Sequence, residues 1–95
     1  LDDSVFVPKE HRLFSAYPNP FNPSVNIPFE LVTQAHVVLN IYDLKGQKVE
    51  TLMDKLLSEG GYEINWNASS NSSGVYVCAL ESDGWISTSK LILIK

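Results

Sequence analysis

The residues that could perform catalysis are few and far apart in this sequence. Nucleophilic catalysis needs a nucleophile, a base within hydrogen-bond reach and a third group that orients the base. The chain has two histidines, His11 and His36, and one cysteine, Cys78. Cys78 shares one face of an expected strand with Tyr76 and Leu80, which predicts a small core residue rather than a nucleophile. His36 opens another expected strand, where we expect it at the surface.

The acidic residues do not form a catalytic pair, and the residue types that bind metals do not form a cluster. The carboxylates are scattered, and no spacing pairs two of them for acid–base catalysis. Asp2 and Asp3 could contact a cation, but a solvated arm is their expected role. One cysteine cannot form an internal disulfide, and the lack of a Cys/His cluster argues against zinc. We therefore expect no enzyme activity, no metal site and no cofactor.

Aromatic side chains suggest a second function class, carbohydrate binding. Exposed rings can stack on sugars, whereas aromatic residues at alternate strand positions usually fill the core. Trp66 is expected in the core. Trp85 follows a hairpin turn, so burial and exposure are equally open for it. The other candidate rings are Tyr42, Tyr62 and Tyr76.

Length and charge narrow the function classes further. A chain of 95 residues has room for one packed core and not for two. A net charge of −4 argues against nucleic acid as a partner. The longest run of aliphatic residues, 91–94, is far shorter than the ~20 residues of a membrane helix. The acidic start has no signal-peptide pattern and no initial Met, so we expect a fragment of a longer protein.

Alternating apolar residues predict most of the strands. Positions 25, 27, 29 and 31 are apolar, and Pro28 predicts that this strand lies at a sheet edge or contains a bulge. The same alternation predicts strands over 37–42, 62–66, 74–82 and 85–94. Hairpin turns are predicted at 43–46 and 83–84, and a further turn at 60–61.

The segment 47–58 fits two kinds of structure. Its apolar residues at 49, 52, 53, 56 and 57 have the spacing of a helical stripe. A hairpin turn precedes the segment, however, and strands surround it. This context favours a strand over Gln47–Met53.

A proline cluster precedes the first long strand. Pro18, Pro20 and Pro23 fix φ and remove backbone donors, so neither a helix nor a central strand can pass through this segment. We expect a rigid loop that packs Tyr17 and Phe21 over one end of the fold. The whole pattern predicts an all-β, immunoglobulin-like antiparallel β-sandwich of about seven strands over 13–95, with 1–12 as a linker or docked arm.

Five segments resemble one known family. Residues 17–24, YPNPFNPS, closely resemble the opening motif of the C-terminal sorting domain (type A) of the type IX secretion system. Four later segments resemble that family's elements in the same order. They are LNIYDLKGQKV at 39–49, GGYEINW at 60–66, SGVY at 73–76 and SKLILIK at 89–95.

The resemblance implies a non-catalytic domain that directs an exported parent protein through the outer membrane in Bacteroidetes and related phyla. Its fold would be a seven-stranded immunoglobulin-like sandwich similar to the Ig-like domain of the flagellar hook-capping protein. The implied partners are the outer-membrane type IX secretion machinery, its sortase-like peptidase and the parent cargo upstream. The domain would be in the periplasm in transit, and the cargo would then be at the outer-membrane surface or secreted.

The resemblance also supplies the candidate site residues. Sorting-signal recognition is expected at Gly74, Tyr76, Lys90 and Lys95, and the loop motif consists of Pro18, Asn19, Pro20 and Phe21. We expect edge pairing to capture the last strand, with the two lysines steering the encounter. The alternative is a structural or carbohydrate-binding Ig-like accessory module of a secreted hydrolase.

Overall fold

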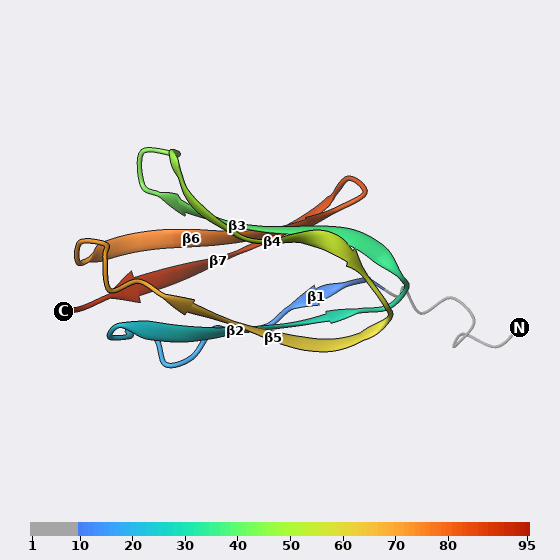
Figure 1. Cartoon of the computed structure of the whole chain (residues 1–95), viewed down its shortest axis with the longest axis horizontal. Coiled ribbons are helices and arrows are strands. Elements are labelled where there is room, and N and C mark those ends of the chain that lie inside the picture. Colours follow the sequence, from blue (N-terminus) through green and yellow to red (C-terminus); the bar gives the residue numbers. More distant parts are fainter. Residues whose placement is uncertain (1–9) are drawn as a thin grey trace, which may run out of the picture.

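Two antiparallel β-sheets pack face to face in the computed structural model, which describes residues 10–95 (Figure 1). One sheet has the order β1-β2-β5 and the other the order β4-β3-β6-β7. The sandwich of seven strands predicted from the sequence is confirmed. Its strands are β1 (Arg12–Leu13), β2 (Ser24–Leu31), β3 (Ala35–Asp43), β4 (Lys48–Leu57), β5 (Gly60–Asn67), β6 (Gly74–Ser82) and β7 (Trp85–Leu93).

The core lies between the two sheets and is built from every second residue of the long strands. In β2 the four apolar positions are at most 1% exposed, as the alternation predicted. The predicted face of β6 is also buried, and so are the inner residues of β3. Burial of this apolar area is the main favourable term in folding. The inward residues of these strands are Val25, Ile27, Phe29, Leu31, Val37, Leu39, Ile41, Tyr76, Cys78 and Leu80.

The prediction for Pro28 is wrong, because β2 is the middle strand of its sheet. The Pro28 carbonyl accepts a hydrogen bond from the Phe14 N–H at 3.0 Å, so the backbone of Pro28 faces the β1 side. β1 has only two residues and its pairing with β2 ends at this point. The missing proline donor therefore faces the place where the neighbouring strand stops, and the long ladder with β5 stays intact.

The strand prediction for 47–53 is confirmed, and β4 extends further, to Leu57. The pairing of β3 with β4 shifts register twice, between Leu39 and Asn40 and between Ile41 and Tyr42. Each shift leaves one extra residue in β4, Leu52 or Val49, without a partner opposite. Such bulges break the alternation of period two. They explain why a strand carries apolar residues at helical spacing.

Glycine and aspartate shape both predicted hairpins. Gly46 has φ 81° and its N–H donates to the Asp43 carbonyl at 3.1 Å, which closes the β3–β4 turn. Asp83 and Gly84 have φ 47° and 85°, the signs that a two-residue β-hairpin of type I′ requires. Residues 60–61 were predicted as a turn, but both are the first residues of β5; the bend lies just before them.

The expected linker or docked arm falls only partly within the structure, because residues 1–9 lie outside the described residues. His11 and Arg12 contact the sandwich. The Val32 N–H donates to His11 Nδ1 at 3.2 Å, and the His11 ring meets Trp85 edge to face at 5.4 Å. Arg12, in β1, lies opposite Glu30 of β2 in the antiparallel pairing of the two strands. Over residues 10–95 no helix has the length and apolar character needed to cross a bilayer.

Replacing Trp66 with alanine is expected to destabilise the fold by about 3–5 kcal/mol. The Trp66 ring is 1% exposed, packs against the rings of Phe21 and Tyr76, and donates from Nε1 to Glu50 Oε1 at 3.0 Å. Urea unfolding followed by circular dichroism measures the loss. The matched control is Trp85→Ala, for which we expect a smaller loss because that ring is only half-buried. Equal losses from the two variants would contradict this view of the core.

Candidate functional site

Cys78, the nucleophile candidate, lies in the core as predicted. It is fully buried in the middle of β6. Burial raises the pKa of the Cys78 thiol to about 11, because the charged thiolate would lose its hydration. A thiol of this kind stays protonated and unreactive at neutral pH.

His36 lies on the outer face of the four-stranded sheet and is solvent-exposed, as expected. Its Nε2 is 2.5 Å from Asp54 Oδ1, across the β3–β4 pairing, and both side chains are more than half exposed. Cys78 is on the inward face of the same sheet, so these groups do not meet. Residues 10–95 contain no group of three or more metal-ligating side chains.

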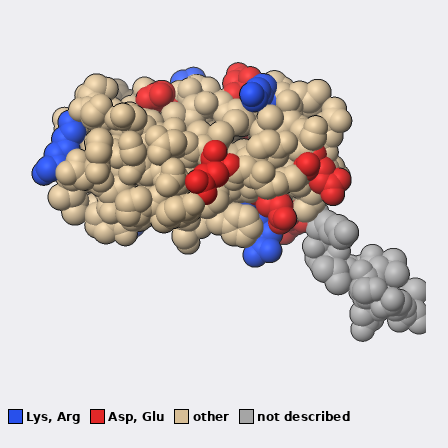
Figure 2. Space-filling model, turned by 60° about the horizontal axis from the view of Figure 1, so that its bottom comes forward, with Lys and Arg blue, Asp and Glu red and all other residues tan. Residues whose placement is uncertain are grey.

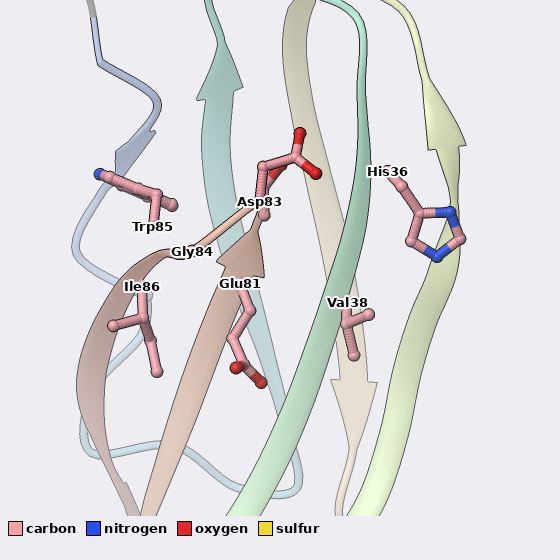
Figure 3. A pocket seen from close by; sticks show the side chains of 8 residues that line it. His36, Val38, Glu81, Asp83, Gly84, Trp85 and Ile86 are labelled. Carbon is pink, nitrogen blue, oxygen red and sulfur yellow. The ribbon is translucent and has the colours of Figure 1, made fainter.

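A hollow in the described part of the chain lies beside the β6–β7 hairpin. It is open to solvent, and its lining includes His36, Glu81, Asp83 and Trp85. Figure 3 shows the Trp85 ring and the His36 ring at opposite sides of this hollow. The two acidic side chains come from β6 and the turn after it.

Within residues 10–95, the candidate aromatic residues do not form a common exposed face. Trp66 is buried, as predicted, and Trp85 is half-buried against His11. The Tyr62 ring stacks on Phe29 at 5.4 Å and its hydroxyl donates to the Ser58 carbonyl at 2.7 Å. This arrangement does not favour the carbohydrate-binding alternative.

The proline loop is joined to the last strand by hydrogen bonds. Asn19 Nδ2 donates to the Lys90 carbonyl at 2.8 Å, and Asn19 Oδ1 accepts from the Ile92 N–H at 3.0 Å. The Phe21 N–H donates to the Ile92 carbonyl at 2.8 Å, and the Phe21 carbonyl accepts from the Ile94 N–H at 2.9 Å. The loop therefore covers the outer edge of β7 from Lys90 to Ile94. The peptide bonds before Pro18, Pro20 and Pro23 are cis.

Phe21 also fixes this end of the core. Its ring is 2% exposed and lies 5.7 Å from Trp66, whose ring meets Tyr76 edge to face at 5.4 Å. The Tyr76 hydroxyl donates to the Ser72 carbonyl at 2.6 Å. A chain of aromatic contacts thus runs from the proline loop, through the core, to the loop before β6.

Lys95 is held at the same end. Its N–H donates to Ser73 Oγ at 3.0 Å, and its Nζ donates to the Ser69 carbonyl at 2.6 Å. Gly74 opens β6 opposite Leu93. The loops that precede β2 and β6 and the end of β7 all lie together at the left of Figure 1.

Lys90 lies apart from the other candidate residues. It is exposed on the outer face of the four-stranded sheet, opposite Val77, and only its carbonyl takes part in the junction with Asn19. The structure therefore brings the loop motif, Gly74, Tyr76 and Lys95 to one end of the sandwich and places Lys90 beside them on the sheet face. We refer to this set as the terminal junction.

The expected packing of Tyr17 over the end of the sandwich is wrong. The Tyr17 ring is 48% exposed. Its backbone forms two hydrogen bonds with Asn26, at 2.8 and 3.0 Å, which place the ring on the outer face of the three-stranded sheet. There the hydroxyl donates to Glu63 Oε1, and this hydrogen bond raises the pKa of Tyr17. Only Phe21 of the two aromatic residues enters the core.

The sequence analysis missed the serines at 69, 72 and 73. They lie in a polar Asn/Ser segment, and this pattern predicts only a loop between two strands. Two backbone carbonyls and one hydroxyl of this loop bind Tyr76 and Lys95. Every residue has a backbone carbonyl, so the sequence does not show which carbonyls bind a distant side chain. The high serine content of the loop is the one feature that could have pointed to the Ser73 hydroxyl.

Charged side chains do not gather into a broad patch on the face seen in Figure 2, where acidic and basic groups are scattered among uncharged ones. Toward the terminal junction lie the lysines at 45, 48, 90 and 95, together with Asp43 and Glu50. At the opposite end lie the carboxylates at 59, 81 and 83, together with Arg12 and Lys55. Both ends of the domain therefore carry charges of both signs.

A model of the family described as "Secretion system C-terminal sorting domain" matches residues 15–95. A search of curated proteins found no match. Among solved structures, the fold is similar to part of the crystal structure of dimeric latent PorU from Porphyromonas gingivalis, with a TM-score of 0.63 and 23% sequence identity. The match covers 93% of this chain and 10% of that one, so the chain spans about a tenth of the length of PorU.

Cys78 is expected to react with a thiol reagent only when the domain unfolds. At pH 8 we expect the folded chain to react at least about a hundredfold more slowly than the chain in 8 M urea, because exposure of the thiol requires global opening. Absorbance after addition of an aromatic disulfide reagent measures the rate. Rapid labelling of the folded chain would show that the thiol is accessible and would contradict its place in the core.

Proposed function

The chain belongs to the family of secretion system C-terminal sorting domains, those of the type IX system, and on that premise we propose that the terminal junction is what the machinery recognises. A sorting domain of a secreted protein needs a surface that stays the same whatever cargo precedes it. The unit that carries this role is 13–95, and the residues before it connect it to the parent. The cargo passes from the periplasm through the outer membrane, to the cell surface or the medium.

One observation carries the proposal. Residues from three distant parts of the chain, 18–21, 74–76 and 90–95, meet at the terminal junction. Asn19 and Lys90 are 71 positions apart, and Ser69 and Lys95 are 26 apart. Hydrogen bonds fix each pair, so the end presents one defined shape to an outer-membrane partner.

The candidate residues have different roles in this proposal. Lys90 and Lys95 are exposed cations that steer an acidic receptor surface toward the junction. Tyr76 is buried, so it acts by holding Ser72 and with it the loop before β6. Gly74 is exposed at the start of β6, where the absence of a side chain lets a partner approach the backbone.

A sortase-like peptidase of the same machinery is the second proposed partner. The residues of the strands from β1 to β7 are paired in the two sheets, so a cut within them would disrupt the sandwich. Because the proposed cargo precedes the domain, we place the cut that separates the two on the N-terminal side of β1.

Export of a fused reporter is expected to fall at least about tenfold when Lys90→Ala and Lys95→Ala are combined, because both steering charges are lost. The reporter carries an N-terminal export signal and is followed by the full chain, in a bacterium with type IX secretion. Immunoblots of the periplasm and the medium measure the distribution. Point variants are used because removal of 91–95 would also remove two buried core residues, Leu91 and Leu93.

The matched control is Lys45→Ala combined with Lys48→Ala, which removes the same charge from exposed positions around the β3–β4 turn. We expect this control to be exported normally. Thermal melts establish that both double variants are folded. Equal export of the two folded double variants would contradict a specific role for Lys90 and Lys95.

A further inference from the structure

The outer edge of β7 carries backbone N–H and C=O groups that could hydrogen-bond to a further strand. β6 pairs with one side of β7 along its whole length. On the other side, four backbone groups point outward at the end of the strand: the Lys90 carbonyl, the Ile92 N–H, the Ile92 carbonyl and the Ile94 N–H. All four are bound by the proline loop.

The proline loop binds these four groups as a neighbouring strand would, although the loop itself is not a strand. Phe21 supplies a backbone N–H and a backbone carbonyl, in a parallel bridge with Leu93. Asn19 supplies the other pair from its side chain, whose amide has the same donor and acceptor as a peptide group. An extended peptide in the parallel direction could offer the same four partners from its backbone.

The two halves of this cover are held with different strength. Phe21 is anchored by a buried ring, and its removal would expose the core. Asn19 is exposed and lies between Pro18 and Pro20, which are exposed as well. Its two hydrogen bonds can be exchanged for bonds to water or to another peptide with no loss of apolar burial. Asn19 is therefore the part that a competing strand can displace.

The edge at the far side of the same sheet is protected in another way. β4 carries two bulges and exposed charged residues, among them Lys48, Glu50 and Asp54. Bulges and charges are permanent obstacles to strand addition. β7 has a regular ladder with β6, and a separate loop occupies its edge instead. The Asn19 side chain covers this edge with two hydrogen bonds that can be exchanged, so its cover is reversible.

We propose that the edge of β7 at Lys90–Ile92 is a strand-docking site, which Asn19 covers in the free domain and which an extended strand of the secretion machinery occupies in its place. This inference rests on the proposed function and names how the partner binds. The partner strand continues the four-stranded sheet. Because Lys90 and Ile92 present their side chains on its outer face, the strand carries a carboxylate opposite Lys90 and an apolar residue beside Ile92.

The first arm of the test asks whether Asn19 is the cover. In Asn19→Ala we expect the Ile92 amide to exchange with deuterium at least about tenfold faster than in the unaltered chain. Asn19→Asp is the control, since its carboxylate still accepts from Ile92. The Ile94 amide, bound by Phe21, is the internal reference and keeps its rate. Unchanged exchange at Ile92 in Asn19→Ala would overturn the proposal.

The second arm asks whether the machinery uses the edge, with the reporter fusion of the preceding section. Ile92→Pro removes the outward N–H and is expected to lower export at least about tenfold, whereas Ile92→Ala, which keeps the N–H, is exported. Normal export of a folded Ile92→Pro would overturn the docking site.

The outcomes separate this inference from the proposed function. Normal export of both variants at Ile92 rejects the docking site and leaves the sorting role standing, whereas failure of the unaltered fusion to be exported rejects the sorting role. Thermal melts report whether Ile92→Pro folds. If it does not fold, the exchange rate of the Ile92 amide in Asn19→Ala decides, because that variant removes only an exposed side chain.

Discussion

The junction between the proline loop and β7 is the contact on which the rest of this sandwich depends. Phe21 takes part in it twice: its backbone pairs with Ile92 and Ile94, and its ring closes the core against Trp66. A sandwich of two sheets is open at its ends unless a loop supplies both apolar cover and hydrogen-bond partners. Here one residue supplies both. The aromatic contacts that begin at Phe21 then reach Tyr76 and position the loop before β6.

The same junction creates a conflict between stability and recognition. β7 contributes two fully buried leucines, so the strand cannot leave the sandwich without unfolding it. Capture of the last strand by edge pairing was expected from the sequence, but its edge is already occupied from Lys90 to Ile94. In the docking that we propose, a partner strand replaces the Asn19 side chain and leaves Leu91 and Leu93 in the core, which resolves the conflict.

Much of the fold could be predicted from the sequence because the long strands alternate strictly. The inward residues of β2 and β6, the two hairpin turns and the burial of Trp66 and Cys78 follow from local pattern. The errors come from tertiary context. Pro28 predicted a sheet edge or a bulge, because no sequence signal shows that the two-residue β1 pairs beside β2 and stops there. The two bulges of β4 break the alternation of its apolar residues, and the spacing that results is also that of a helix. Asn19 and Ile92 are 73 positions apart, so their pairing has no local signature.

The most direct measurement is transfer of export to an unrelated protein by this chain. A periplasmic reporter with its own inner-membrane signal is followed by residues 1–95 and expressed in two strains, one with a working type IX system and one in which its outer-membrane translocon is deleted. The account predicts that the reporter reaches the surface or the medium in the first strain and stays in the periplasm of the second. Retention of the reporter in the periplasm of both strains would contradict it.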